Sequence, residues 1–201
     1  LIPRYYDVQS GKVCVNGVNV KDYPQGDLVS KVGMIPQKAV LFEGTIRENM
    51  QWGKEDATDE EIWHALEIAQ AADVVRSKNG LDAMIEQNGR NLSGGQKQRL
   101  TIARALLKDP EILIMDDSAS ALDFATDLKL RRAIHNLGNQ MTVFIVSQRA
   151  STVRAANQIL VLDDGNLVGI GTHDELMKNC QVYQEIYYSQ FPEEKPKEVM
   201  A

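Results

Sequence analysis

The feature that constrains this chain most is a regular alternation of predicted helices and strands that begins near residue 93. A helix is predicted to start after Ser93 and to end before Pro110, and the short apolar run Ile112–Met115 follows it. A second helix is predicted at about 125–136, before the apolar run Met141–Val146. Short, continuously apolar runs are typical of parallel strands buried on both faces. We therefore predict an α/β core in this half of the chain.

Hairpins are predicted on both sides of this core. Residues 12–20 alternate in polarity around Asn16-Gly17, which is a strong hairpin signal. A second hairpin is predicted at 159–170, around Asp164-Gly165. A short strand is also expected over residues 31–36, and Pro36 is expected to end it.

Helices are predicted mainly from their N-terminal caps. A Ser or Thr followed three residues later by Glu or Gln forms a capping box. Four such pairs occur: Thr45 with Glu48, Thr58 with Glu61, Ser93 with Gln96, and Thr172 with Glu175. After Thr58, apolar residues recur at helical spacing as far as Ala72, and Gly80 is the predicted stop. The first two boxes indicate a mostly helical insert at about 40–92, and the last box begins a C-terminal helix.

Composition limits the class of protein. The chain has 201 residues and a net charge of −6, which argues against a nucleic-acid binder because such proteins need a basic face. No apolar run approaches the roughly 20 residues that a membrane-spanning helix needs. The two cysteines, Cys14 and Cys180, form neither a disulfide framework nor a metal site, so we expect both to be small apolar fillers.

The histidines and most aromatic residues are expected to have structural roles. His64, His135 and His173 are expected to be solvated, since none has a second ligand-type residue at metal spacing. We expect Trp52 and Trp63 to pack within the helical insert. The last helix carries an aromatic stripe that we expect to dock it: Tyr183, Tyr187 and Tyr188.

Leu92–Gln96 is the first candidate for chemistry. Ser93 caps the helix, and Gly94 and Gly95 leave backbone N–H groups uncovered. A helix N-terminus with bare amides and a partial positive charge binds phosphate. An ordinary capped helix with a glycine turn would have the same sequence, so both interpretations stay open at this point.

The second candidate is the acidic pair Asp116-Asp117 at the end of the apolar run Ile112–Met115. In open α/β sheets the ligand lies at the carboxyl ends of the strands. One carboxylate there can hold Mg²⁺, directly or through water, and the next can orient a nucleophilic water. A strand that runs into an acidic loop is the alternative, as at Asp163-Asp164.

The order of these motifs resembles the nucleotide-binding domain of ABC transporters, and its exporter branch in particular. The resemblance covers residues 1–190 and is very specific because several motifs combine. Each of six segments resembles one family motif: Val32–Gln37 resembles the Q-loop, Leu41–Asn49 the exporter stretch, Leu92–Gln96 the signature motif, Ile112–Asp116 the Walker B strand, Ser120–Asp123 the D-loop, and Val146–Arg149 the switch loop.

The resemblance implies an α/β fold: a P-loop NTPase (RecA-like) core with a helical signature subdomain and a small antiparallel β piece. It implies one nucleotide-binding domain over 1–190. Within it we expect the helical subdomain at about 40–100, the α/β core at 101–175 and a C-terminal helix at 176–190. Residues 191–201 are expected to form a flexible tail. The family's first strands and phosphate loop are missing from the sequence.

The resemblance also implies the cofactors ATP and Mg²⁺ and a role for each motif. In this family two copies sandwich two ATP molecules, each between the Walker side of one copy and the signature of the other. Gln37 would contact Mg²⁺ and the attacking water, and Asp116 would hold Mg²⁺, mostly through water. Ser93–Gln96 would bind the γ-phosphate of the partner's ATP, and Asp123 would act across the dimer seam.

No stretch of the sequence matches the phosphate loop G-x-x-x-x-G-K-[S/T], in which Lys binds the β- and γ-phosphates and Ser or Thr holds Mg²⁺. The pairs Gly11-Lys12 and Gly53-Lys54 are followed by Val and Glu instead. Leu1–Asp7 resembles the end of the helix that follows this loop. We therefore expect the chain to begin just downstream of its own ATP cradle, with the adenine-stacking aromatic residue also upstream.

Two residues depart from the family pattern at the catalytic positions. Asp117 stands where the family usually has a catalytic Glu, and misplacing a catalytic group by about 1 Å can cost on the order of 100-fold in rate. Gln148 stands where the family has the switch His; it can donate a hydrogen bond but cannot shuttle a proton. We therefore predict a degenerate Walker site with an intact signature, as in one half of a heterodimeric exporter.

The resemblance places the chain at the cytoplasmic face of the cell membrane, with a second ABC subunit as partner. Transmembrane domains would be fused upstream of Leu1, and the isolated chain would be an inactive part of an ATPase. Two alternatives stay open. One is a regulatory module that clamps nucleotide without hydrolysis, which Asp117 and Gln148 favour. The other is a soluble ABC ATPase acting on DNA or ribosomes, against which the acidic charge and Leu41–Asn49 argue.

We expect the isolated 201-residue chain to bind MgATP very weakly, because its sequence contains neither a phosphate loop nor the adenine-stacking residue. Isothermal titration calorimetry tests this directly. Micromolar affinity of the chain for MgATP would contradict the prediction.

Overall fold

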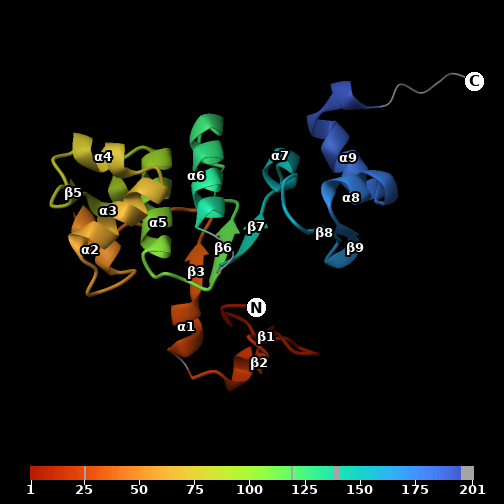
Figure 1. The fold of residues 1–201 in the computed structure, drawn as a ribbon, viewed down its shortest axis with the longest axis horizontal. Coiled ribbons are helices and arrows are strands. Elements are labelled where there is room, and N and C mark those ends of the chain that lie inside the picture. Colours follow the sequence, from red (N-terminus) through yellow and green to blue (C-terminus); the bar gives the residue numbers. More distant parts are fainter. Residues whose placement is uncertain (25, 119, 138–140, 196–201) are drawn as a thin grey trace, which may run out of the picture. The chain divides into compact units, whose positions relative to one another are not determined.

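The computed structural model describes residues 1–24, 26–118, 120–137 and 141–195 (Figure 1). It divides into two compact units, Leu1–Val146 and Ser147–Ala201, and each is described by itself. Among the helices of the described residues, none is both long enough and apolar enough to cross a membrane.

The first unit is built on a parallel sheet with the strand order β3-β6-β7 (Figure 1). β6 (Ile112–Asp116) lies between β3 (Val32–Ile35) and β7 (Thr142–Val146) and pairs with both along its length. The three middle residues of β6, Leu113–Met115, are buried. The predicted parallel sheet is therefore confirmed, with β6 as its buried central strand.

β7 differs from the prediction that Met141–Val146 is a buried strand. Phe144 is 39% exposed and Val146 is 55% exposed, whereas Leu113 on β6 is fully buried. Within the described ranges β7 pairs only with β6, so its other edge is open. The prediction is right about the strand and wrong about its burial.

Five helices of the first unit share one apolar cluster with β3 and β6. They are α2 (Ile46–Gln51), α3 (Asp59–Ile68), α4 (Ala72–Ser77), α5 (Gly94–Leu106) and α6 (Phe124–Asn136). The cluster includes fully buried side chains from α2, α3, α5 and α6, such as Ile46, Ile62, Leu100 and Leu130. It fastens the helices to the sheet that carries the candidate site.

All four predicted capping boxes are present. The side chain of each cap residue accepts a hydrogen bond from the backbone N–H three residues on, and the Glu or Gln there accepts one from the backbone N–H of the cap. These interactions start α2, α3, α5 and α8 (His173–Asn179) where the sequence predicts. Asp123 also caps a helix, α6. The sequence pattern predicted this helix at about 125–136 but did not predict its cap.

The helix predicted from Thr58 towards Gly80 is interrupted. α3 ends at Ile68, Gln70 adopts a left-handed φ of 58°, and α4 follows. The carbonyl of Gln70 accepts a hydrogen bond from the guanidinium of Arg99 on α5. A residue distant in the sequence thus holds the break, which explains why apolar spacing alone did not predict it.

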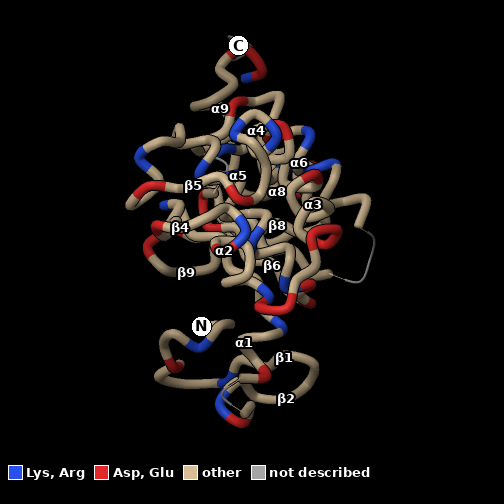
Figure 2. Tube along the Cα trace, turned by 90° about the vertical axis from the view of Figure 1, so that its left-hand side faces the viewer, with Lys and Arg blue, Asp and Glu red and all other residues tan. Residues whose placement is uncertain are grey.

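The helical insert also contains a short β pairing. β4 (Gly44–Thr45) pairs antiparallel with β5 (Met84–Ile85), a feature that the mostly helical prediction missed. Beside it, the guanidinium of Arg47 makes ion pairs with Asp59 and Asp82, which join α2, α3 and the segment before β5. Acidic and basic residues are interspersed over these elements (Figure 2).

Trp52 is not packed inside the insert as predicted. It is 70% exposed, and its ring centroid lies 5.0 Å from that of Phe42, which is 45% exposed. The guanidinium of Arg104 lies over the Phe42 ring, 5.9 Å from its centroid. We call Phe42, Trp52 and Arg104 the Trp52 surface. Trp63 does pack against the apolar cluster, as predicted.

The predicted N-terminal hairpin is confirmed. β1 (Cys14–Val15) and β2 (Val18–Asn19) pair around Asn16 and Gly17, whose φ values are 50° and 79°. Val15 is buried and Cys14 is exposed, because neighbours in a strand face opposite sides; the expectation that Cys14 is an apolar filler is wrong.

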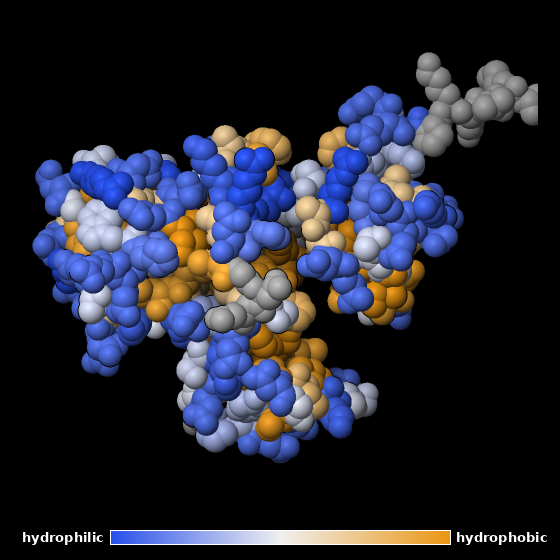
Figure 3. All heavy atoms as spheres, in the orientation of Figure 1, coloured by the Kyte–Doolittle hydropathy of each residue, from blue (hydrophilic) through white to orange (hydrophobic). Residues whose placement is uncertain are grey.

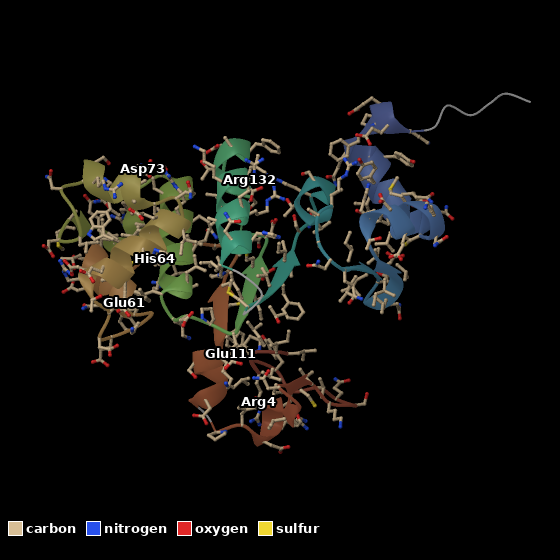
Figure 4. The ribbon with its side chains drawn as sticks, viewed as in Figure 1. Arg4, Glu61, His64, Asp73, Glu111 and Arg132 are labelled. Atoms are coloured by element: carbon tan, nitrogen blue, oxygen red, sulfur yellow. The ribbon has the colours of Figure 1, made fainter. Side chains whose placement is uncertain are left out.

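A short 3-10 helix, η1 (Val20–Asp22), and α1 (Asp27–Lys31) lead from this hairpin to β3. Glu111, labelled in Figure 4, ties the hairpin to the core. Its carboxylate accepts a 2.7 Å hydrogen bond from Asn16 Nδ2 and pairs with the ammonium of Lys31. Glu111 thereby links the start of β6 to the β1–β2 hairpin through Asn16 and to α1 through Lys31.

The second unit joins a hairpin to helices. After α7 (Ala150–Val153), β8 (Ile159–Asp163) and β9 (Asn166–Gly171) form the predicted hairpin. The helix predicted at 176–190 is two helices, α8 and α9 (Gln181–Gln190), separated at Cys180, whose extended backbone (φ −123°, ψ 101°) cannot continue a helix.

One side of this hairpin packs on the helices and the other does not. Ile159 and Val161 belong to an apolar cluster with Leu176, Tyr183 and Cys180, which is buried as expected. In contrast, several leucines and isoleucines of the hairpin are more than half exposed, and Figure 3 shows hydrophobic atoms over it: Leu160, Leu162, Leu167 and Ile170.

The structure describes residues 191–195, the first part of the predicted tail over 191–201. Pro192–Glu194 forms a 3-10 helix, η3, and the Tyr187 hydroxyl donates a 2.7 Å hydrogen bond to Glu194. This contact fixes the segment after α9. Residues 196–201 lie outside the described residues.

An aromatic cluster docks α9, as predicted for its tyrosine stripe. Tyr183 and Tyr187 are only 3% and 1% exposed. His173 is partly buried here, and its Nδ1 lies 3.0 Å from the Tyr183 hydroxyl. The expectation of solvated histidines is therefore wrong for His173, although His64 and His135 are exposed.

We expect the second unit to lose stability on acidification. Burial and the nearby Arg154 guanidinium lower the pKa of His173 below its ordinary value of 6.5, against a smaller opposing effect of Asp174 and Glu194. The unfolded chain therefore binds a proton at a higher pH than the folded unit does, so stability falls as the pH drops below about 6.5.

Urea unfolding followed by the NMR signals of the Tyr183 and Tyr187 rings at pH 7.5 and 5.5 measures this effect. A His173→Gln control should show a smaller difference between the two pH values. An equal difference in the two proteins would exclude His173 as the source.

Candidate functional site

The candidate site lies at the carboxyl ends of the parallel strands. Gln37 follows β3 after Pro36, Asp116 ends β6, and Asp117 follows it directly. Because parallel strands end at the same edge, these side chains come together. The Gln37 Nε2 donates a hydrogen bond to Asp117 Oδ2 over 3.2 Å, although 80 residues separate them.

Asp117 is held by its backbone as well as by its side chain. Its N–H donates to the carbonyl of Val146 on β7, at 2.9 Å. Its carbonyl accepts hydrogen bonds from Ser120, from the backbone N–H at 3.2 Å and from Oγ at 2.8 Å. Its φ is 43°, in the left-handed region that Asp tolerates better than most residues.

Asp116 is the last residue of β6 and is partly exposed beside Asp117. In the described part of the chain, no three His, Cys, Asp or Glu side chains gather to form a metal site. Mg²⁺ is commonly held by one or two carboxylates, with phosphate oxygens and water as the other ligands. Two neighbouring carboxylates with the Gln37 amide close by fit an ion that arrives with a nucleotide.

The signature stretch forms the N-terminus of α5. The Ser93 Oγ accepts a 3.3 Å hydrogen bond from the Gln96 N–H, and the Gln96 side chain accepts one of 3.0 Å from the Ser93 N–H. The Ser93 hydroxyl proton is not used in this box and can be donated to a ligand. Ser93 and Gly94 are exposed, so a phosphate can approach the end of this 13-residue helix.

The two signature glycines lie in different surroundings. A Cβ on Gly94 would have nothing within 4 Å, whereas a Cβ on Gly95 would lie 3.1 Å from the carbonyl of Ala121. Gly95 therefore allows the D-loop to approach the start of α5. The sequence analysis expected both glycines to leave backbone N–H groups uncovered. In the structure Gly94 lies in open space, whereas Gly95 makes room for the Ala121 carbonyl.

Asp123, at the end of the D-loop, is engaged within the chain. Its carboxylate accepts hydrogen bonds from Thr126, from the backbone N–H at 2.9 Å and from Oγ1 at 2.7 Å. These bonds lower the pKa of Asp123 below its ordinary value. The carboxylate is thus ionised and oriented, and it starts α6. Ala119, which directly precedes the D-loop, lies outside the described residues.

Sequence analysis missed one residue next to this site. Gln98 on α5 is 1% exposed, and its Nε2 donates a 3.2 Å hydrogen bond to the carbonyl of Pro36, which immediately precedes Gln37. Its spacing of one helical turn from Ile102, on the helix predicted after Ser93, was the available signal.

Gln148 belongs to the second unit. Its side chain is exposed, and its carbonyl accepts a 2.8 Å hydrogen bond from Gln190 Nε2 on α9. The other end of that amide, Gln190 Oε1, accepts a bond from the Ala150 N–H at 2.9 Å. A single side chain of α9 therefore fixes the backbone on both sides of Arg149.

A matched pair of variants tests the different environments of the glycines. Gly95→Ala should shift the amide NMR signals of Ala121, Leu122 and Asp123, because the added methyl group would press on the Ala121 carbonyl. Gly94→Ala should leave those signals in place, since its methyl group meets no atom of the chain. Equal shifts in the two variants would contradict the close contact at Gly95.

Known proteins resemble this chain along most of its length. The family model of the ABC transporters matches residues 1–120. The ABC transporter ATP-binding protein YfiB of Bacillus subtilis is 46% identical over 195 residues, which are 96% of this chain and 34% of YfiB. The B. subtilis protein YgaD, named as a multidrug export ATP-binding/permease protein, is 43% identical over 93% of this chain and 32% of YgaD. The chain spans about a third of the length of these relatives.

A solved structure agrees with these matches. The structure of a bacterial Atm1-family ABC exporter with ATP bound is similar with a TM-score of 0.90 and 34% sequence identity, over 94% of this chain and 34% of that chain. The predicted fold class, an α/β P-loop NTPase core with a helical signature subdomain, is confirmed by this similarity. This chain belongs to the ABC transporter family.

Proposed function

We propose that this chain is the ATP-binding domain of an ABC exporter and that residues 1–190 form it, with ATP and Mg²⁺ as cofactors. ATP binding and hydrolysis at a dimer interface would drive export of a substrate. The names of the relatives support an export role, since YgaD is named as an export protein that combines ATP-binding and permease parts.

Within that domain, the chain's own Walker side would be degenerate. The observation that carries this proposal is the geometry of Asp117, a short carboxylate on a left-handed backbone with one oxygen hydrogen-bonded to Gln37. A general base must reach the attacking water. The backbone conformation and the bond from Gln37 restrict the positions that the short side chain of Asp117 can reach. Gln148, which takes the place of the switch His, adds no proton shuttle.

Mg²⁺ would be held by Asp116, mostly through water, with the amide oxygen of Gln37 near it. The ion would neutralise phosphate charge. Asp116 is suited to this because it is partly exposed at the end of a strand that packing holds rigid. Gln37 can leave Asp117 and turn towards the ion because its side chain is exposed.

The intact signature would complete the competent site of a different ABC subunit. Gly94 is open to solvent and Ser93 keeps a free hydroxyl proton, so both can meet the γ-phosphate of the partner's ATP. Asp123, already ionised and oriented by Thr126, would act at the same seam. A heterodimer follows, because one copy would supply the catalytic Glu and this chain the signature.

The Trp52 surface would receive the membrane-spanning part of the exporter. Exposing a Trp and a Phe side by side costs solvation free energy unless a partner covers them. The guanidinium of Arg104 over the Phe42 ring adds a positive charge to this surface. The chain would then lie at the cytoplasmic face of the cell membrane.

A regulatory module that clamps ATP without turning it over is the second candidate. The restrained Asp117 and the exposed Gln148 favour it for the chain's own site. The accessible signature favours a part in catalysis instead, since its open glycine serves no packing purpose in this chain.

Two variants in the purified, intact transporter with its partner test the proposal at saturating ATP. Gly94→Asp should nearly abolish ATPase activity, because a carboxylate beside a triphosphate is repelled where screening is least. Asp117→Asn touches only the degenerate site, so turnover should fall by a small factor, far less than about 100-fold.

The thermal stability of Gly94→Asp serves as the control, and it should be unchanged because the position is open. If Asp117→Asn is as damaging as Gly94→Asp, Asp117 is a working base and the asymmetric site is excluded. If neither variant has an effect, the chain acts as the regulatory clamp.

A further inference from the structure

Gln98 is unusual among the residues of α5. It is 1% exposed, and it shares a helix face with the buried residues Thr101 and Ile102. Burying an amide group costs free energy unless it is hydrogen-bonded. The Nε2 of Gln98 meets this need by donating to the Pro36 carbonyl, across 62 residues of sequence.

The bond to Pro36 controls more than one atom. The Pro36 carbonyl and the Gln37 N–H belong to the same planar peptide unit. Fixing that oxygen restricts rotation of the whole unit and so sets the direction in which Gln37 leaves β3. The Gln37 side chain then reaches Asp117 at 3.2 Å.

A continuous path therefore joins the two halves of the candidate site. It runs from Ser93 along α5 to Gln98, which is about 7.5 Å farther along the helix axis at 1.5 Å per residue. From Gln98 it passes through the Pro36–Gln37 peptide to Asp117. The carbonyl of Asp117 in turn accepts two hydrogen bonds from Ser120 in the D-loop.

We propose that Gln98 is a positioning residue that transmits movement of the signature helix to Gln37. When α5 shifts, Gln98 carries the Pro36–Gln37 peptide with it and changes the hydrogen bond between Gln37 and Asp117. The functional use of this link rests on the proposed nucleotide role of Ser93 and Gln37. The link itself is a property of the chain without nucleotide.

The test uses the 201-residue chain without nucleotide or partner, so its outcome does not depend on the ATP-binding proposal. The side-chain amide NMR signals of Gln37 are identified by their loss in Gln37→Glu. Their position without the Asp117 bond is taken from Asp117→Gly, in which glycine tolerates the positive φ.

Gln98→Met keeps the length of the side chain and removes the donor. The Gln37 amide signals should move from the wild-type position towards the Asp117→Gly position. Gln98→Asn keeps the amide and shortens its reach, so it gives a milder variant with the same expected shift if Gln98→Met fails to fold.

Gln98→Glu provides a rescue that a packing role would not produce. Its carboxyl group can donate to the Pro36 carbonyl only when it is protonated, and burial favours that form. Lowering the pH from 8.0 to 5.5 should return the Gln37 signals towards the wild-type position in Gln98→Glu and leave them displaced in Gln98→Met.

Arg99→Met is the matched control on the same helix. Arg99 also donates to a distant backbone carbonyl, but to that of Gln70 and not to the Pro36–Gln37 peptide. Its loss should leave the Gln37 signals in place. The proposal is overturned if the Gln98 variants leave these signals unmoved, if Arg99→Met moves them equally, or if Gln98→Glu shows no return at low pH.

Discussion

The pairing of β6 with β3 and with β7 determines the positions of the polar groups on the Walker side. Parallel register brings the ends of the three strands to one edge, so Gln37, Asp116 and the Val146 carbonyl become neighbours there. Leu113 and Met115 pack β6 against the helix cluster, and Ile114 packs its other face against Val15, Val20 and Leu28. The hydrogen bonds at the edge are geometric consequences of this register, because a slip by one residue would turn Asp117 to the other face.

The two sides of the candidate site differ in how far the chain itself engages them. On the signature side, Gly94 and the Ser93 hydroxyl face open space and are available to a second molecule. On the Walker side, Asp117 is restrained by Gln37, by Val146 and by Ser120. This difference supports the proposal that the signature side of this chain serves a second subunit.

Features that depend on neighbouring residues were predicted well from the sequence. Features that depend on contacts between distant residues were predicted poorly. The capping boxes and the turn at Asn16-Gly17 involve residues within a few positions of each other, so the sequence contains the whole interaction. The break at Gln70 depends on Arg99, and the burial of His173 depends on α9. These contacts form only when elements far apart in the sequence pack.

The same distinction holds for the site. The motifs named the residues at the strand ends and at the start of α5, because each motif is continuous in sequence. The amide bond from Gln98 to Pro36 and the approach of Ala121 to Gly95 join segments far apart in the chain. Spacing cannot reveal such contacts. The roles of Gln37, Asp116, Asp123 and Gln148 towards nucleotide stay predictions.

The left-handed backbone at Asp117 limits how this site can change in evolution or by engineering. Left-handed φ values are uncommon for long side chains, and for L-residues the conformation costs about 1–2 kcal/mol. A glutamate introduced here would favour an ordinary backbone conformation, and adopting it would strain the bonds to Val146 and Ser120. Lengthening the carboxylate at this position is therefore opposed by the backbone conformation that these bonds hold.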